Sequence, residues 1–439
     1  MTNELHISMG WERLEEGTEE ERACFGLLTI CYGRCLTEGL DGFVERSRRG
    51  PLISGYHLAE WIAWNWWRLV SETKPVRLNP EWEFAHRLST IGSGYIWPDI
   101  TIFSDRQRTV LVAKPTHPEG FAPFRYAADL AVIIPTTQFE GAVESFMGQI
   151  QGQLRAEAVP DTNLDRVWSE VRSELADPET TARRRLEALL GFDPDEGDPE
   201  LLEQLVSDAS RLGQDAIQEI AADHKDHTVP TADDFNALVK KYGRDTRPVD
   251  MVQLADLGNL LCDNVPAWQH GYTAARMLRE QERLSQTPLD NLRLSQLCAI
   301  TEKALEPSEG TNFAFSIDDE SKKTGSVVLR SKWEAGRRFE LARLLGDRLT
   351  NGLTERLIPA TRAYTYRQKL QRAFAAELLC PFEALEDKLD GDYSIDARED
   401  AAHYFNVSER TVTTMLVNHR QLDRDYLEGD IEPLDALAY

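Results

Sequence analysis

The chain has 439 residues, a formal net charge of −25 and a sequence pI near 4.8. Its length suits two or three domains, and its composition is that of a globular protein. An acidic surface repels phosphate, so this charge disfavours sequence-independent binding to nucleic acid or to an anionic membrane, although it permits a local basic patch. We therefore expect a protein partner or a basic peptide and no nucleic-acid partner.

The N-terminal residues 1–17 are polar and acidic, and they lack the basic-then-apolar order of a signal peptide. No run of about eighteen apolar residues occurs in the chain, so no membrane-spanning helix is expected. Both features favour a cytoplasmic location. The six cysteines are scattered, and we expect reduced thiols. Cys31 and Cys35 are candidate zinc ligands, but no second pair with suitable spacing follows them.

Residues 1–150 are predicted to form an α+β domain. Strand-like alternation marks residues 4–8 and 24–35, and residues 50–72 have the pattern of one helix. Four tryptophans crowd the middle of that helix, at positions 61, 64, 66 and 67. The favoured interpretation is an aromatic core beneath a sheet. The alternative is a partner-binding surface built from Trp61, Trp64 and Trp67, since tryptophan dominates interface hot spots.

A strand pair is expected at residues 99–103 and 109–113. Its sequence approaches the pattern of restriction-type nucleases, in which a Pro-Asp and an acid-x-Lys surround Mg²⁺. Pro98, Asp99 and Lys114 fit that pattern, but Val112 stands where the second acid is needed, so the cation would lose an oxygen ligand. The simpler interpretation is a hairpin with a solvated lysine.

Residues 151–267 are predicted to be a helical, acidic middle region. A long helix is expected from Pro199 to about Asp223, because proline suits the first turn of a helix. His224 and His227 follow as an H-x-x-H pair, which suits either metal ligation or, more commonly, a helix C-terminus. Residues 242–249 have the composition of a linker.

Two amphipathic helices are expected between residues 337 and 381, each burying one face. The identities of their residues are more informative than the helical spacing of the apolar positions. The first contains Arg338, Phe339, Leu341, Ala342 and Gly346, and the second contains the run FAAELL at residues 374–379, followed by Pro381. These letters resemble the ImmA/IrrE family of metallopeptidase-like proteins over roughly residues 268–422. The resemblance implies a zincin-like C-terminal domain in a chain that is otherwise α+β and predominantly helical.

At the positions of the zinc-binding motif, this chain carries residues that differ from those of the family. In an H-E-x-x-H helix, two histidines hold the metal and the glutamate activates bound water. The matching positions carry Arg343, Leu344 and Asp347, and the third ligand of the family, a glutamate, falls at or near Gln368. Arginine repels a cation and leucine accepts no proton. We therefore expect no metal, no cofactor and no zincin catalysis, and we expect Arg343 and Asp347 to form an ion pair on one helix face.

Residues 397–422 have the form of a helix-turn-helix, with Ser408 as the cap of its second helix. The segment is nearly charge-balanced, which favours a structural role over DNA contact. An acidic tail follows at residues 423–439. Family members with an intact site cut repressors in mobile elements or act in bacterial stress responses. The resemblance thus implies a non-catalytic regulatory or protein-interaction protein.

Two other functions remain open. The chain is a DNA-binding transcriptional regulator if residues 397–422 contact DNA. It is an active zinc peptidase if other ligands converge, and the histidines available for that purpose are His224, His227, His270 and His403.

Overall fold

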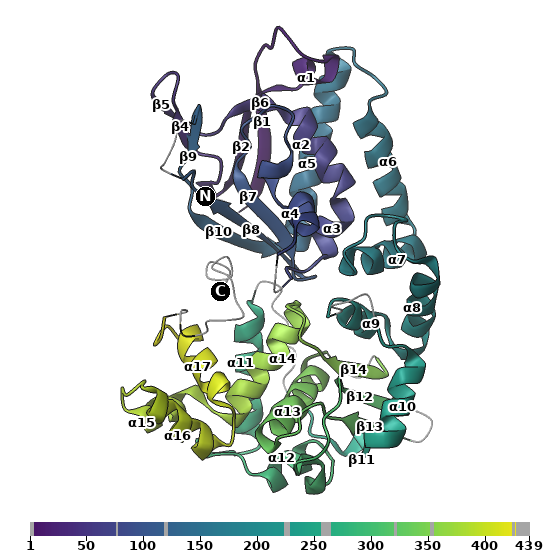
Figure 1. Ribbon diagram of the computed structural model, residues 1–439, viewed down its shortest axis with the longest axis vertical. Helices are drawn as coiled ribbons and strands as arrows, with labels where there is room; N and C mark the ends of the chain where they lie inside the picture. The colour runs from purple at the N-terminus through teal and green to yellow at the C-terminus, as the bar shows by residue number, and fades with distance from the viewer. Residues whose placement is uncertain are drawn as a thin grey trace. The chain divides into compact units, whose positions relative to one another are not determined.

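The computed structural model describes residues 4–75, 78–117, 122–223, 229–255, 265–319, 323–351, 355–423 and 426. The chain forms two compact units, Met1–Asp198 and Pro199–Ile431, in which helices predominate over strands (Figure 1). This confirms the predominantly helical α+β class. The boundary between the units divides the expected middle region, 151–267, so that its first helices belong to unit 1 and its later helices to unit 2. Within the described ranges, no helix is both long enough and apolar enough to cross a membrane.

Unit 1 begins with a strand and ends with three helices. Its elements are β1 (Leu5–Trp11), α1 (Glu19–Ala23), β2 (Phe25–Tyr32), β3 (Arg34–Cys35), β4 (Gly39–Asp41), β5 (Arg46–Arg48), β6 (Leu52–Ser54), α2 (Gly55–Trp64), α3 (Trp66–Ser71), α4 (Pro80–His86), β7 (Asp99–Ser104), β8 (Arg108–Lys114), β9 (Phe124–Tyr126), β10 (Leu130–Pro135), α5 (Thr136–Ala156), α6 (Asn163–Ala176) and α7 (Pro178–Leu189).

The strands of unit 1 form small antiparallel sheets. β2 pairs with β1, β3 and β6, β8 lies between β7 and β10, and β4 lies between β5 and β9. Helix α5 packs on β1 and on α2, and α6 packs on α2, so one apolar core lies between the strands and these helices (Figure 1). Both segments expected as strands near the N-terminus are therefore strands.

The tryptophan-rich segment forms two helices, whereas one was expected. Helix α2 ends at Trp64, and Asn65 leaves helical geometry with φ −98° and ψ 10° before α3 begins at Trp66. The side-chain amide of Asn65 donates to the Trp61 carbonyl at 2.8 Å and so binds the end of α2. The break turns Trp66 and Trp67 into the core, where Trp66 meets Trp168 of α6 edge-on at 5.2 Å.

Unit 2 surrounds one four-stranded sheet with helices. Its elements are α8 (Pro199–Leu212), α9 (Gln214–Ala221), α10 (Ala232–Tyr242), β11 (Arg244–Thr246), α11 (Ala267–Gln281), α12 (Asn291–Leu297), β12 (Ala314–Asp319), β13 (Thr324–Val328), α13 (Glu334–Asn351), β14 (Leu357–Ala360), α14 (Tyr366–Leu379), α15 (Phe382–Leu389), α16 (Ile395–Phe405) and α17 (Glu409–Asn418).

The sheet of unit 2 is antiparallel with the order β11-β13-β12-β14. Helix α13 packs on β14 and on α14, and α14 also packs along α11. The two helices expected from residues 337 to 381 are confirmed as α13 and α14. The helix-turn-helix form is confirmed as α16 and α17, and the Ser408 hydroxyl accepts the Thr411 N–H at 3.1 Å as the expected cap.

Two expectations for the start of unit 2 are wrong. The long helix from Pro199 is broken at Gly213, whose φ of +121° interrupts the helix between α8 and α9. The expected linker at 242–249 contains β11, which pairs with β13 at the edge of the sheet. A three-residue edge strand carries too little alternation to be recognised from sequence. Of the acidic tail, only residues 423 and 426 are described.

Candidate functional site

Helices α13 and α14 bring Arg343, Asp347 and Gln368, three of the four positions of the degenerate motif, to a close crossing. A Cβ atom on Gly346 would lie 2.5 Å from the Phe374 ring, so only glycine permits the two helices to approach this closely. Both residues belong to the letters that resemble the ImmA/IrrE family. Arg343 and Asp347 flank Gly346 on α13, and they reach α14 from this crossing.

Arg343 is a buried guanidinium, 4% exposed, that touches no carboxylate among the described residues. Its Nη2 donates to the Thr361 carbonyl at 2.7 Å, to Gln368 Oε1 at 2.5 Å and to Gln371 Oε1 at 3.2 Å. Its Nε is buried without a hydrogen-bond partner. Burial, together with the smaller effect of the nearby Arg372, lowers the pKa of Arg343 to about 9.

Asp347 is a buried carboxylate, 1% exposed, with several donors around it. Arg367 binds it in a bidentate manner at 2.6 and 2.7 Å, and the side-chain amides of Gln371 and Asn351 each donate at 2.9 Å. Burial opposes ionisation, but Arg367 and the two amides outweigh it and lower the pKa of Asp347. Arg367 also donates to Glu355 at 2.9 Å, so its guanidinium binds two carboxylates, those of Asp347 and Glu355.

The expected ion pair between Arg343 and Asp347 is wrong. Asp347 pairs with Arg367 of α14 instead, and Gln371 lies between the two expected partners. Its amide oxygen accepts from Arg343 while its amide nitrogen donates to Asp347. A buried carboxylate is stabilised more by a bidentate arginine on the facing helix than by a neighbour four residues along its own helix.

Gln368 and Leu344 also have structural roles. Gln368 is fully buried, its oxygen accepts the Thr361 N–H at 2.9 Å, and its nitrogen donates to the Pro359 carbonyl at 3.2 Å. Gln368 thereby binds α14 to the end of β14, while Leu344 packs in the apolar core of unit 2. We call Arg343, Asp347, Arg367, Gln368 and Gln371 the Arg343 network.

Sequence reasoning identified Arg343, Asp347 and Gln368 but missed Arg367 and Gln371. A signal for them was present, because Gln371 lies one turn after Gln368 and four residues after Arg367 on a single helix. A buried aspartate also requires a cation, and Arg367 is the basic residue that α14 provides for it.

Other candidate metal ligands do not gather in the described part of the chain. There, no group of three or more His, Cys, Asp and Glu side chains is positioned to hold a metal ion. His270 Nδ1 lies 3.3 Å from the Tyr366 hydroxyl, and His403 is exposed on α16. His224 and His227 lie outside the described residues.

The three tryptophans of the expected surface differ in exposure. Trp67 is 2% exposed and donates from its indole N–H to Glu174 at 2.7 Å, so it belongs to the core and was wrongly included. Trp64 is 57% exposed. Trp61 is half-buried, and its indole donates to the Phe84 carbonyl at 3.1 Å, beside a Phe84 ring that is 63% exposed. We call Trp61, Trp64 and Phe84 the aromatic surface of unit 1.

The expected hairpin that carries the nuclease-like residues is formed by β7 and β8, in which Asp99 lies opposite Lys114. Arg87 binds both oxygens of Asp99, at 2.7 and 2.8 Å, and Val112 is fully buried. Lys114 is exposed. The Asp99 carboxylate thus forms a salt bridge with Arg87. The simpler interpretation of a hairpin with a solvated lysine is confirmed.

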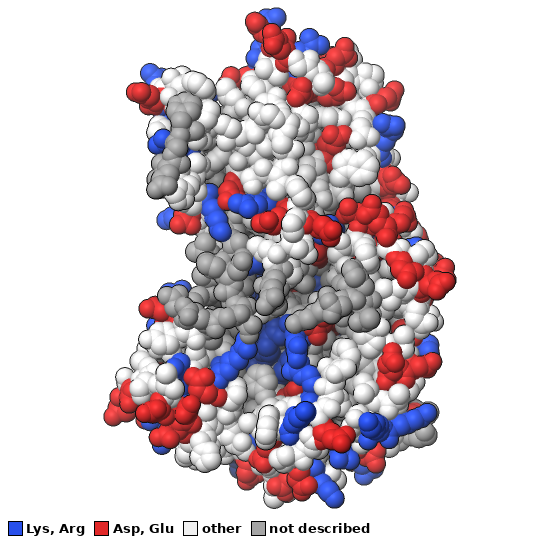
Figure 2. Space-filling view, viewed as in Figure 1, with Lys and Arg blue, Asp and Glu red and all other residues white. Residues whose placement is uncertain are grey.

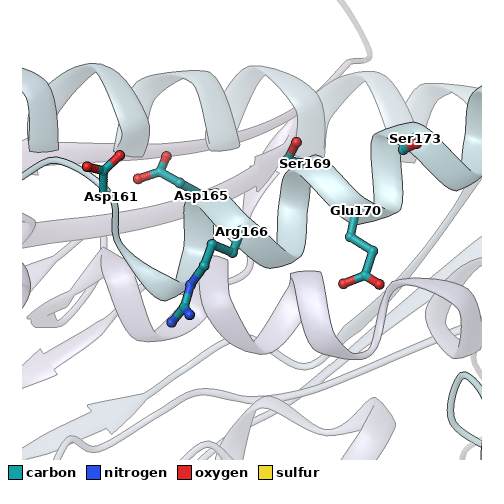
Figure 3. Close-up of a pocket in the computed structure, with 6 residues that line it drawn as sticks. All are labelled: Asp161, Asp165, Arg166, Ser169, Glu170 and Ser173. Atoms are coloured by element: carbon teal, nitrogen blue, oxygen red, sulfur yellow. The ribbon is translucent and has the colours of Figure 1, made fainter.

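A shallow groove follows the outer face of α6 (Figure 3). It is lined by Asp161, Asp165, Arg166, Ser169, Glu170 and Ser173, and all of these except Asp165 are exposed. Asp165 completes the capping box of α6 by accepting the Thr162 N–H at 3.0 Å. These residues lie along one side of a helix and its N-terminus, and they surround no enclosed space. The groove has no feature of an active site.

Comparison of the chain with protein-family models, with curated proteins and with solved structures finds no match. The resemblance to the ImmA/IrrE family therefore rests on the residues of α13 and α14 alone.

Proposed function

We propose that the chain is a non-catalytic relative of the ImmA/IrrE metallopeptidases that acts by binding a protein or peptide partner. One observation carries the proposal. The positions that hold zinc ligands in that family are occupied by the Arg343 network, whose hydrogen bonds join α13, α14 and β14. A buried guanidinium at the place of the first ligand repels a cation and supplies no lone pair for it.

The face of unit 2 over α14 supports binding of an anionic segment. Figure 2 shows Lys and Arg side chains gathered there, on a chain whose net charge is −25. Arg362 is exposed, and Lys369 and Arg372 are half-buried on α14 or just before it. We call these three residues the α14 basic face. Local positive charge on an acidic protein steers association toward an acidic peptide or protein segment.

The aromatic surface of unit 1 supports the same kind of function. Trp61 and Trp64 lie three residues apart, on one side of α2. Trp64 and Phe84 expose most of their rings, and exposed aromatic residues are enriched at protein interfaces. The regulatory setting, a bacterial or mobile-element stress or defence response, is implied by the family resemblance alone.

The DNA-binding alternative receives less support from the side chains of α16 and α17. Arg398, one of the few basic residues of that segment, is buried, donates to Thr413 at 2.8 Å and lies 3.4 Å from Glu409. A phosphate-binding arginine must reach the surface.

The first experiment is the metal content of the chain purified without chelator, measured by mass spectrometry. We expect zinc well below one atom per chain. Zinc near one per chain, with peptidase activity that a chelator abolishes, would refute the proposal.

A grafted variant tests the family relation independently. Arg343→His, Leu344→Glu, Asp347→His and Gln368→Glu together restore the ligands of the family, and we expect the folded variant to gain about one zinc per chain. Circular dichroism confirms that the variant is folded. A folded variant that binds no zinc would contradict the placement of the family's site at this crossing.

A further inference from the structure

Two cysteines face each other across a tight hairpin in unit 1. Strand β2 turns at Gly33, whose φ is +65°, into β3, and the antiparallel register pairs Cys31 directly with Cys35. Facing residues of an antiparallel pair have Cα atoms about 4.5–5.5 Å apart, which lies inside the range for a disulfide. The two sulfur atoms are 2.8 Å apart as free thiols. A disulfide can therefore form here with little movement of the backbone.

The surroundings make the two sulfurs unequal. The Cys31 thiol donates to Cys35 Sγ and receives a contact from the Arg49 guanidinium at 3.7 Å. The Cys35 thiol donates to the Arg49 carbonyl at 3.1 Å and lies 3.4 Å from the Thr37 hydroxyl. The hydrogen bond from Cys31 is the main cause that lowers the pKa of Cys35 to about 5, against the opposing effect of burial. The same bond raises the pKa of Cys31. The lowered pKa of Cys35 favours this residue as the attacking sulfur, because the attacking sulfur in thiol–disulfide exchange is a thiolate.

The other described cysteines have none of these features. Cys24, Cys298 and Cys380 are fully buried and stand apart as free thiols. Burial raises the pKa of Cys24 to about 12 and also raises those of Cys298 and Cys380. Both members of the hairpin pair, by contrast, are partly exposed.

We propose that Cys31 and Cys35 form a redox-active dithiol that reacts with low-molecular-weight disulfides, with Cys35 as the attacking sulfur and Cys31 as the resolving one. The Cys35 thiolate attacks one sulfur of the disulfide RSSR, breaks the S–S bond and releases RS⁻. The resulting mixed disulfide is attacked by Cys31, which loses its proton and displaces the second RS⁻. Two electrons pass from the protein to the small disulfide, and one Cys31–Cys35 bond and two RS⁻ result, one of which takes the proton from Cys31 and the other a proton from water.

The test uses the full-length reduced protein and oxidised glutathione as the probe. After incubation at several ratios of oxidised to reduced glutathione, free thiols are alkylated and the peptides are identified by mass spectrometry. We expect a disulfide between Cys31 and Cys35 that dithiothreitol reverses. Absence of that disulfide at every ratio would overturn the proposal.

Single variants test the two roles. In Cys31→Ser, the glutathione adduct on Cys35 should accumulate, because no resolving thiol is left. In Cys35→Ser, the adduct on Cys31 should form more slowly than the adduct on Cys35 does in Cys31→Ser. Cys24→Ser is the matched control and should oxidise like the wild type. Equal adduct formation in Cys31→Ser and Cys35→Ser would contradict the assignment of an attacking and a resolving sulfur.

A kinetic measurement separates this chemistry from zinc ligation. At pH 7 we expect iodoacetamide to modify Cys35 roughly ten-fold or more faster than Cys24 in the native chain, with a pH midpoint well below that of a free thiol. Protection of both sulfurs that disappears on adding a chelator would instead identify a metal-bound pair and refute the dithiol.

Discussion

Two buried carboxylates of unit 2 have opposite electrostatic environments. Asp347 receives a bidentate arginine and two amides, which lower its pKa. Glu377 of α14 is also buried, but its closest cation, Arg276, lies 3.8 Å away, and burial raises the pKa of Glu377 to about 7. The first carboxylate therefore stabilises the fold through its charge, while the second costs free energy when it ionises.

Asp347→Asn removes the charge that balances Arg367, and we expect a loss of about 3–5 kcal/mol in the free energy of unfolding. The measurement is urea unfolding at pH 7. Because the pKa of Asp347 is lowered in the fold, its contribution is present above the unfolded value of about 3.9 and is lost as pH falls through the folded value. The difference from wild type should thus stay constant between pH 5 and 8. The exposed Asp387→Asn is the control and should change stability by less than about 0.5 kcal/mol.

Glu377 should make stability depend on pH in the opposite direction, so that its contribution to the free energy of unfolding falls as pH rises. The folded chain holds a proton on Glu377 up to about pH 7, whereas the unfolded chain loses it near pH 4.3, so stability falls as pH rises between these values. The rise from 4.5 to about 7, at about 1.4 kcal/mol per pH unit, sets a ceiling of about 3.5 kcal/mol.

At pH 8 we therefore expect Glu377→Gln to be more stable than the wild type, by no more than this ceiling. The difference in the free energy of unfolding between the two should disappear near pH 4. Thermal unfolding across this range measures it. The exposed Glu399→Gln should leave the pH dependence unchanged. A Glu377→Gln variant that follows the wild-type pH profile would show that Glu377 is not protonated in the fold at neutral pH.

At the scale of elements, the crossing of α13 and α14 depends on one glycine. Gly346→Ala places a methyl group within 2.5 Å of the Phe374 ring, and we expect a loss of about 1–3 kcal/mol in urea unfolding. Gly141→Ala on α5 is the matched control, because its added methyl group meets no atom within 4 Å. That variant should gain about 0.5–1 kcal/mol from the better helix propensity of alanine. Equal effects of the two substitutions would contradict the tight crossing.

The elements with strong periodicity were predictable from sequence, and those decided by single contacts were not. Helices α13 and α14 and the β7–β8 hairpin follow from the spacing of their apolar residues and from turn residues. The breaks at Asn65 and Gly213 were missed, because each depends on one residue within an otherwise continuous helical pattern. β11 was missed because an edge strand is defined by its partner.

Three residues of the candidate site, Arg343, Asp347 and Gln368, were predictable from sequence, but Arg367, Gln371 and the contacts between the five were not. Sequence placed Arg343 and Asp347 on one helix, which the structure confirms. It did not show that α14 supplies Arg367 and Gln371, because which residues of two distant helices face each other depends on how they pack. The ion pair expected within α13 was wrong for that reason.

At the scale of the whole molecule, the core of unit 1 extends past the expected boundary at residue 150. Trp168 and Val171 of α6 and Ala188 of α7 are buried members of that core. A fragment of residues 1–198 should therefore unfold cooperatively on heating. A fragment of residues 1–150 lacks these side chains and should bind a hydrophobic dye and lose the sharp transition. A cooperative transition in the shorter fragment would place the boundary of the folding unit near residue 150.

The Arg343 network also constrains how the sequence can evolve. Glu355 accepts the backbone N–H groups of Asp215 and Ala216 with one oxygen and binds Arg367 with the other, so the network continues to the start of α9. On the proposed ancestry, a return to zinc ligation would pass through intermediates in which Asp347 is replaced and the buried Arg367 loses its bidentate carboxylate. Natural selection would remove such intermediates before a metal could stabilise them. The exchange of catalysis for internal hydrogen bonds would therefore behave as an evolutionary ratchet.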